Sequence, residues 1–208
     1  MKGLLLKDWY MTKKYCKYYL FVGIGFIILS LMSKGNMFFI FYPCLLCGMI
    51  PVNLLGYDER SRWTEYVGAL PYTKTQIVSA KYLIGLFAQI AMLTVTCIAQ
   101  GIKMSVDGEF VLKEFLVLVM LLLIMATVTS SVTLPFIFKL GVEKGRAAYY
   151  VMIGVVCAGS IISTTIFNES MRTEVQLNGI LPIICLVGIG IYVLSWYLSI
   201  VFYKKREL

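Results

Sequence analysis

Few residues in this sequence have side chains that could perform catalytic or metal chemistry at a shared site. The chain has six cysteines and no histidine, which removes Cys–His and Ser–His nucleophilic pairs and most zinc sites. Cys44 and Cys47 form a Cys-x-x-Cys motif, a spacing that can support redox or metal chemistry. Because both lie inside a long apolar run, we interpret them as small buried hydrophobic residues. No catalytic site and no metal site is predicted.

Nucleotide chemistry is not indicated either. The chain has no GxxxxGK[ST] sequence, whose backbone amides and lysine hold nucleotide phosphates. The segment GVEKGR at 141–146 contains two glycines but lacks that spacing. We therefore predict that this chain is not an enzyme and that it holds no cofactor itself.

The composition decides which elements can position the polar residues. Hydrophobic residues make up 60% of the 208 residues and charged residues 14%, against about a quarter in soluble domains. A soluble domain of this size cannot cover so much apolar surface, so we predict a single integral membrane domain over residues 1–208. The net charge of +8 comes from basic residues beside the apolar segments and not from a contiguous basic surface, which argues against nucleic-acid binding.

Six segments without any Asp, Glu, Lys or Arg are predicted to be transmembrane helices. Lipid cannot satisfy open backbone groups, and about 20 helical residues cross the hydrocarbon core. The first segment is shorter, but the lysine side chains that flank it can extend its reach. The predicted spans are about 18–33, 35–57, 82–102, 115–138, 147–168 and 178–203. The predicted fold class is therefore an all-α membrane protein.

The distribution of basic residues predicts the orientation. With six spans and both termini on one side of the membrane, fifteen of the 19 Lys and Arg residues lie on that side. If the first span only dipped into the membrane, the split would become ten against nine. The positive-inside rule therefore favours six spans with both termini in the cytoplasm. No carboxylate would then lie at membrane depth, so a proton-coupled pump would lack its usual acidic residue.

The N-terminal segment 1–17 is predicted to be an amphipathic helix that lies on the cytoplasmic leaflet. On a helical wheel its five lysines fall on one broad arc. The bulky residues mostly opposite them are Leu4, Leu5, Trp9, Met11 and Tyr15. Asp8 interrupts this apolar arc and weakens the amphipathic pattern. The alternative is a basic tail without regular structure.

Residues 58–81 form the longest loop on the predicted cytoplasmic side. The first half has helical potential and ends near Gly68 and the Leu70–Pro71 pair. Thr73 or Thr75 can then cap a new helix that continues into the third span. A short helix that is held by a turn and is continuous with a span suits the transmission of force from a soluble partner. The alternative is a solvated connector whose charges only stop translocation.

Hydroxyl and amide side chains inside the spans are candidates for lining a translocation path. The same residue types more often hold helices together or hydrogen-bond to their own helical turn. The candidate residues are Gln89, Thr94, Thr129, Ser130, Ser160 and Ser163.

The sequence DERSRWTEYVGALPYTKTQIVSAKYL at 58–83 resembles the loop between spans two and three of type-2 ABC transporter permeases, the ABC-2 family. The shared features are an acidic and basic start, an aromatic residue, Leu-Pro, a polar pair, Ile-Val, and Lys-Tyr before the next helix. LLLKDW at 4–9 is similar to the start of the N-terminal interfacial helix in that family. Six spans, cytoplasmic termini and small outer loops match as well.

The resemblance implies a coupling helix over residues 59–66 that is seated in a cleft of an ATPase subunit. The implied ATPase contacts are Asp58, Glu59, Arg60, Arg62, Trp63, Glu65 and Tyr66. A second, shorter cytoplasmic contact is implied over residues 139–146. Its candidate residues are Lys139, Glu143, Lys144 and Arg146.

The resemblance also implies partners and cargo. The permease would pair with a second copy of itself or with a related permease, and two separate ATPase subunits would bind ATP and Mg²⁺. The small bacterial members that this chain resembles export amphipathic toxin or antimicrobial peptides across the plasma membrane. The chain lacks the long outer domain of larger members, which argues against export of polysaccharides or complex lipids. The alternative function is a non-transporting membrane interaction or assembly protein whose charged loop docks a partner.

Overall fold

The computed structural model describes residues 1–32, 37–67, 69–108, 110–166 and 177–205 of the chain. Every regular element in these ranges is an α-helix, which confirms the predicted all-α class. The helices are α1 (Lys2–Tyr15), α2 (Lys17–Met32), α3 (Met37–Arg60), α4 (Trp63–Val67), α5 (Lys74–Val106), α6 (Leu112–Leu140), α7 (Val142–Ile166) and α8 (Leu177–Lys205).

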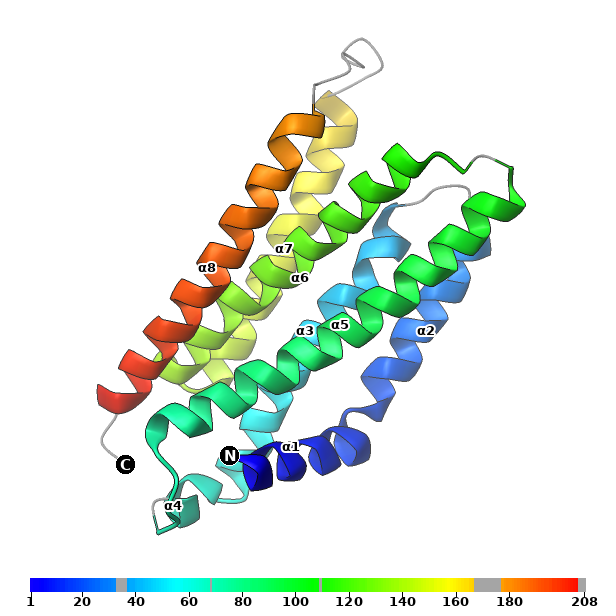
Figure 1. Ribbon diagram of the computed structural model, residues 1–208. Coiled ribbons are helices and arrows are strands. Elements are labelled where there is room, and N and C mark those ends of the chain that lie inside the picture. Colours follow the sequence, from blue (N-terminus) through cyan, green and yellow to red (C-terminus); the bar gives the residue numbers. More distant parts are fainter. Residues whose placement is uncertain (33–36, 68, 109, 167–176, 206–208) are drawn as a thin grey trace.

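The long helices form an elongated bundle (Figure 1). α2, α3 and α5 to α8 run along the length of this bundle, whereas α1 lies across one of its ends. The short helix α4 and the last turn of α8 lie at that same end, so the two ends of the described chain share one side of the molecule. We call this side the α1 end.

α3 is the central helix of the bundle. It packs against α2, α5, α6 and α7, and its Cys44, Ile50 and Val52 side chains are completely buried. The approach to α6 is close because Gly48 has no side chain, and a Cβ atom there would overlap the methyl group of Thr129. Small residues at such crossings let helices meet tightly where lipid supplies no hydrophobic driving force between them.

Four helices of the described chain are long and apolar enough to cross a membrane. They are α3 (from Phe38), α5, α6 and α8 (from Pro182). α1 and α2 bend by 61° at the break between them, and they provide a fifth crossing if the bent pair is counted as one span. The predicted set of six spans is therefore not confirmed. α7 occupies the position of the predicted fifth span as far as Ile166, and the rest of that span lies outside the described residues.

The start of α5 confirms one predicted helix boundary. Thr73 Oγ1 accepts a hydrogen bond from the backbone amide of Gln76 at 3.3 Å, and Gln76 Oε1 accepts one from the amide of Thr73 at 3.2 Å. This reciprocal capping box satisfies two amides that would otherwise have no partner in the first turn. Thr73, and not Thr75, is the cap.

The segment before this cap differs from the coupling helix expected over residues 59–66. α3 continues to Arg60, so Glu59 and Arg60 belong to its last turn. Arg62 has a φ of 51°, which stops the helix because a left-handed conformation cannot continue a right-handed one. α4 then covers only five residues.

The N-terminal segment forms a helix that ends before Cys16, but its faces differ from the predicted wheel. The helical wheel predicts Trp9 opposite the lysines, yet Trp9 is 48% exposed and Lys13 Nζ lies 5.2 Å from the centroid of its ring. The face that packs on the bundle contains Leu4, Asp8 and Thr12, which are all buried. Asp8 therefore lies at the centre of the buried face.

Candidate functional site

Four charged side chains meet where α1, α3 and α5 converge at the α1 end. Lys81 Nζ lies 2.7 Å from Asp8 Oδ1 and 2.6 Å from Asp58 Oδ2. Lys7 Nζ lies 2.6 Å from Asp58 Oδ1 and 3.5 Å from Asp8 Oδ1. We call Lys7, Asp8, Asp58 and Lys81 the ion cluster. It joins α1 to the last turn of α3 and to the third turn of α5.

The ion cluster is buried and electrically balanced. Asp8 and Lys81 are each 2% exposed, Asp58 is 4% exposed, and Lys7 is partly buried. An isolated ion loses several kcal/mol when it leaves water, and a buried pair offsets that cost only when its geometry is good. Two carboxylates and two ammonium groups lie within salt-bridge distance, so the cluster carries no net charge. Loss of one member leaves a buried charge without a full partner.

The short helix α4 is attached to this cluster. Lys7 Nζ lies 4.1 Å from the centroid of the Trp63 ring, a cation–π distance. Val67, at the other end of α4, is 1% exposed and packs in one hydrophobic cluster with Leu4 of α1 and Ile77 of α5. α4 is therefore held on the same three elements that supply the ions.

A small cavity lies beside the ion cluster. Asp58 and Lys81 line it together with Trp63, and α6 and α8 contribute Phe138 and Tyr203. Its volume is about 30 Å³. The cluster thus lies at a junction that also involves the α6 and α8 ends.

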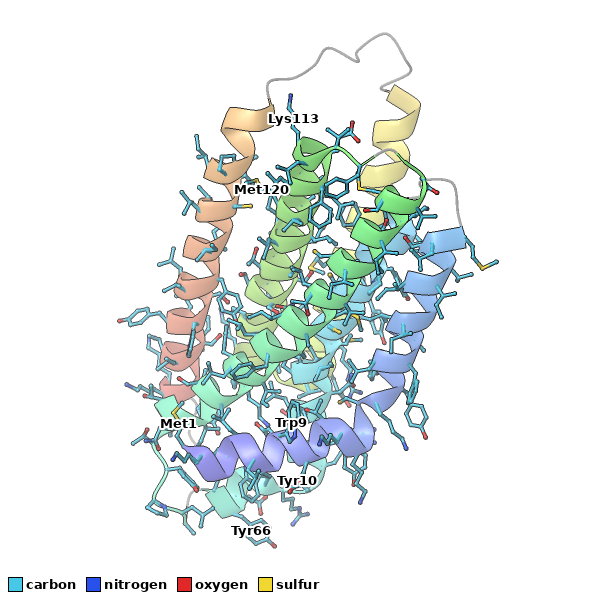
Figure 2. All side chains as sticks on the ribbon, turned by 45° about the vertical axis from the view of Figure 1, so that its right-hand side comes forward. Met1, Trp9, Tyr10, Tyr66, Lys113 and Met120 are labelled. Carbon is cyan, nitrogen blue, oxygen red and sulfur yellow. The ribbon has the colours of Figure 1, made fainter. Side chains whose placement is uncertain are left out.

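Five of the seven side chains implied as ATPase contacts are exposed at the α1 end. The exposed residues are Glu59, Arg60, Arg62, Glu65 and Tyr66. Trp63 is partly buried under Lys7, and Asp58 faces inward as a member of the ion cluster. Tyr66 is 67% exposed and points away from the bundle at the end opposite Lys113 (Figure 2). The exposed residues form what we call the α4 surface.

The second implied contact lies next to the α4 surface. α6 ends at Leu140 and α7 begins at Val142, so Gly141 alone makes the turn between them, with a φ of 88° that suits glycine. A Cβ atom on Gly141 would lie 3.9 Å from Glu59 Oε1, which places this turn against the end of α3. Lys139, Glu143 and Lys144 are exposed there, and Arg146 is partly buried with its guanidinium beside Gly56. The structure thus brings the two implied contact segments together.

The candidate path-lining residues mostly act between or within helices. Gln89 Nε2 donates to the backbone oxygen of Ala126 at 2.9 Å and to Ser130 Oγ at 2.8 Å, which ties α5 to α6. Thr129 is buried and donates to the oxygen of Met125 in its own helix. Thr94 is exposed and donates to the oxygen of Ala91. The side chains of Ser160 and Ser163 lie outside the described part of the structure.

Other polar contacts in the bundle were not anticipated from the sequence. The Tyr82 hydroxyl lies 2.9 Å from Ser195 Oγ and 2.6 Å from Ser199 Oγ, and it connects α5 to α8. Gln100 Nε2 donates to Ser30 Oγ at 2.6 Å and connects α5 to α2. α5 therefore carries polar contacts to α1, α2, α3, α6 and α8 along its length.

The two cysteines of the Cys-x-x-Cys motif lie inside the bundle. Cys44 and Cys47 are free and completely buried in α3, as expected of small hydrophobic side chains. No group of three or more Cys, Asp or Glu side chains in the described ranges is placed to hold a metal ion.

The described chain is thus a bundle of long apolar helices with an exposed, charged end that packs around buried ions. Residues 3–204 match a family model described as an ABC-2 family transporter protein. The chain belongs to this family. The match covers nearly the whole chain and supports a permease subunit, since ABC-2 membrane proteins in general work with ATPase subunits. In the same comparisons no curated protein and no solved structure matches the chain.

Replacement of Lys81 in this ABC-2 protein by methionine tests the ion cluster. Lys81→Met leaves two buried carboxylates with Lys7 as their only cation in the cluster, so we expect a loss of about 3–5 kcal/mol in the free energy of unfolding. Asp8→Asn combined with Lys81→Met removes one charge of each sign and keeps the Lys7–Asp58 pair, so it should recover at least half of that loss. Chemical unfolding of the full chain in detergent micelles measures both values.

Lys144→Met is the matched control because Lys144 is exposed at the same end of the bundle. It should change the free energy of unfolding by no more than about 0.5 kcal/mol. Equal stability of the Lys81→Met and Lys144→Met variants would contradict the account of the ion cluster.

Proposed function

We propose that this chain is the membrane-spanning permease subunit of an ATP-driven exporter of amphipathic peptides. Family membership supports the permease role. The observation that carries the proposal is the α1 end. There, the two segments implied as ATPase contacts, residues 58–66 and 139–146, lie side by side next to the ion cluster. Two ATPase subunits would bind ATP and Mg²⁺, and each of them would dock on one permease of a pair.

The α4 surface has the composition of a docking site for a soluble protein. Tyr66 is a large exposed aromatic side chain, and aromatic residues with arginine are the usual anchors of protein interfaces. Arg62 and Glu65 lie within a few residues of it and supply charges of both signs. Lys144 on the neighbouring turn would widen the contact. Mixed charges around an aromatic anchor suit a specific protein partner better than a partner whose surface carries charge of one sign only.

The connection from this surface to the bundle suits transmission of movement. The capping box at Thr73 starts α5 only a few residues after α4. α5 has 33 residues, which corresponds to about 50 Å of helix and is more than the thickness of the hydrocarbon core. Because Lys81 fixes α5 to α1 and α3, a shift of α4 would move the ends of several helices together.

The proposed cargo rests on the resemblance to small bacterial permeases of this family. The absence of Asp, Glu, Lys and Arg from residues 82–102 and 115–138 suits an amphipathic molecule better than an ion or a proton-coupled solute. We propose that a second copy of the chain or a related permease completes the transport unit. The proposed location is the bacterial plasma membrane, with the α1 end in the cytoplasm.

Reconstitution with an ABC ATPase from the same cell tests this function. The chain alone should hydrolyse no ATP, whereas the complex in lipid vesicles should hydrolyse it faster when an amphipathic helical peptide is added. A scrambled peptide of the same composition and without the amphipathic pattern is the matched control. Equal rates of ATP hydrolysis with both peptides would contradict the proposal that amphipathic peptides are the cargo. A stable complex without any transport would support the alternative of a non-transporting docking protein.

The α4 surface gives a more local prediction. Tyr66→Ala should weaken ATPase binding by on the order of 2 kcal/mol, or about thirtyfold, because it removes the exposed aromatic anchor. Glu65→Lys should weaken binding further by changing the sign of a contact charge. Co-purification and a binding titration of detergent-purified full chain measure both effects.

Tyr197→Ala is the control for truncation of an exposed tyrosine. Tyr197 is 65% exposed on α8, close to the 67% of Tyr66, but its exposed neighbours on that helix include the apolar residues Leu194 and Leu198. This variant should bind the ATPase like the unaltered chain. Equal binding by all three variants would show that the segment is only a connector.

A further inference from the structure

The outward face of α1 combines lysines with aromatic side chains. Trp9 is 48% exposed and Tyr10 is 64% exposed, and both lie on α1 at the edge of the bundle (Figure 2). Lys13 and Lys14 are exposed in its last turn, and Lys17 and Tyr18 continue the surface at the start of α2. We call Trp9, Tyr10, Lys13, Lys14, Lys17 and Tyr18 the α1 outer face.

This face carries positive charge without an opposing acid on its own helices. Asp8 is the only acidic residue among the first 57 residues of the chain. It is 2% exposed and is engaged by Lys81, so its charge does not reach the surface. Lys7 also turns inward, toward Asp58. The ion cluster therefore removes the one negative charge that would have weakened the cationic surface of α1.

The length of α2 places the α1 outer face near lipid headgroups. The 16 residues of α2 correspond to about 24 Å of helix, less than the roughly 30 Å of hydrocarbon in a bilayer. A membrane crossed by α2 therefore reaches its first residues, Lys17 and Tyr18. α1 departs from the α2 axis by 61°, so its last turn, with Lys13 and Lys14, lies only a few ångströms farther along that axis.

Each of the three lysines also lies against an aromatic ring. Lys13 Nζ is 5.2 Å from the Trp9 centroid, Lys14 Nζ is 5.2 Å from the Tyr15 centroid, and Lys17 Nζ is 5.5 Å from the Tyr18 centroid. Tryptophan and tyrosine favour the level where hydrocarbon meets water, and lysine reaches from that level into the headgroups.

We propose that the α1 outer face binds the headgroups of anionic phospholipids. The charge of these headgroups complements a surface of three lysines, and the adjacent rings fit the acyl-chain boundary below them. Each lysine near an anionic membrane surface strengthens binding about fivefold, so three exceed a hundredfold in the ideal case. This lipid site does not depend on the proposed peptide export.

Native mass spectrometry of the full chain in detergent tests the site. The probes are dioleoylphosphatidylglycerol, which is anionic, and dioleoylphosphatidylcholine, which is zwitterionic. The unaltered chain should bind the anionic lipid at least tenfold more tightly. The combined substitution Lys13→Gln, Lys14→Gln and Lys17→Gln should remove most of this preference, and the corresponding lysine-to-arginine substitutions should keep it.

The control combines Lys144→Gln, Lys204→Gln and Lys205→Gln. These three lysines are also exposed at the α1 end, so the control has the same net charge as the glutamine variant. It should change the lipid preference by less than about twofold. Equal losses in both variants would show a general charge effect and overturn the proposal.

Two further outcomes are decisive. The single variant Lys14→Gln should lose about fivefold, which keeps the test usable if the triple variant does not fold. If the triple variant binds the anionic lipid normally but no longer co-purifies with the ATPase, the α1 outer face belongs to the protein partner and the lipid site is refuted.

Discussion

The buried ammonium group of Lys81 sets the arrangement of the whole α1 end. It needs negative partners because it is almost completely buried, and the two carboxylates come from different helices, Asp8 in α1 and Asp58 in α3. Lys7 balances the second carboxylate and reaches Trp63 of α4. Four helices thus meet at one set of charges, and withdrawal of α1, α3 or α5 would leave a buried ion without a full partner.

This constraint also explains the division between the inner and outer surfaces of the α1 end. The cluster uses the two aspartates and Lys7 inside the protein, so the outward side of α1 is left with lysines and aromatic rings. On the neighbouring side, α4 is fixed with Tyr66 outward and Val67 inward. One buried site therefore orients a cationic face suited to lipid and a mixed-charge face suited to a protein.

In the proposed transporter, the close contact of the two turns would give this end a mechanical role. Gly141 places the α6–α7 turn against Glu59, so a partner on the α4 surface also reaches α6 and α7. α5 links the same region to the far end of the bundle and carries hydrogen bonds to α2, α6 and α8 on the way. In that transporter, a force applied at α4 would reach several helices of the bundle through these contacts.

Much of this architecture could be predicted from the sequence because it depends on local patterns. Gaps without charged residues predict the long helices, and Thr73 is one of the two caps that the sequence offers for the start of α5. The ion cluster could not be predicted from local patterns. Asp8 and Lys81 are 73 residues apart in the sequence, and they meet only in the tertiary structure. The family resemblance implies Asp58 as an ATPase contact, although its position in the last turn of α3 turns it inward. The available signal was Asp8 itself, an acid at the centre of an otherwise apolar helical face.

Hydrogen–deuterium exchange on the full chain in lipid nanodiscs tests most directly whether the ion cluster binds these elements into one unit. With Lys81→Met, the account predicts faster amide exchange in α1, α4 and the first turns of α5 together, with α6 and α8 unchanged in their central turns. Faster exchange confined to the turns around residue 81, with α1 and α4 as protected as in the unaltered chain, would contradict it.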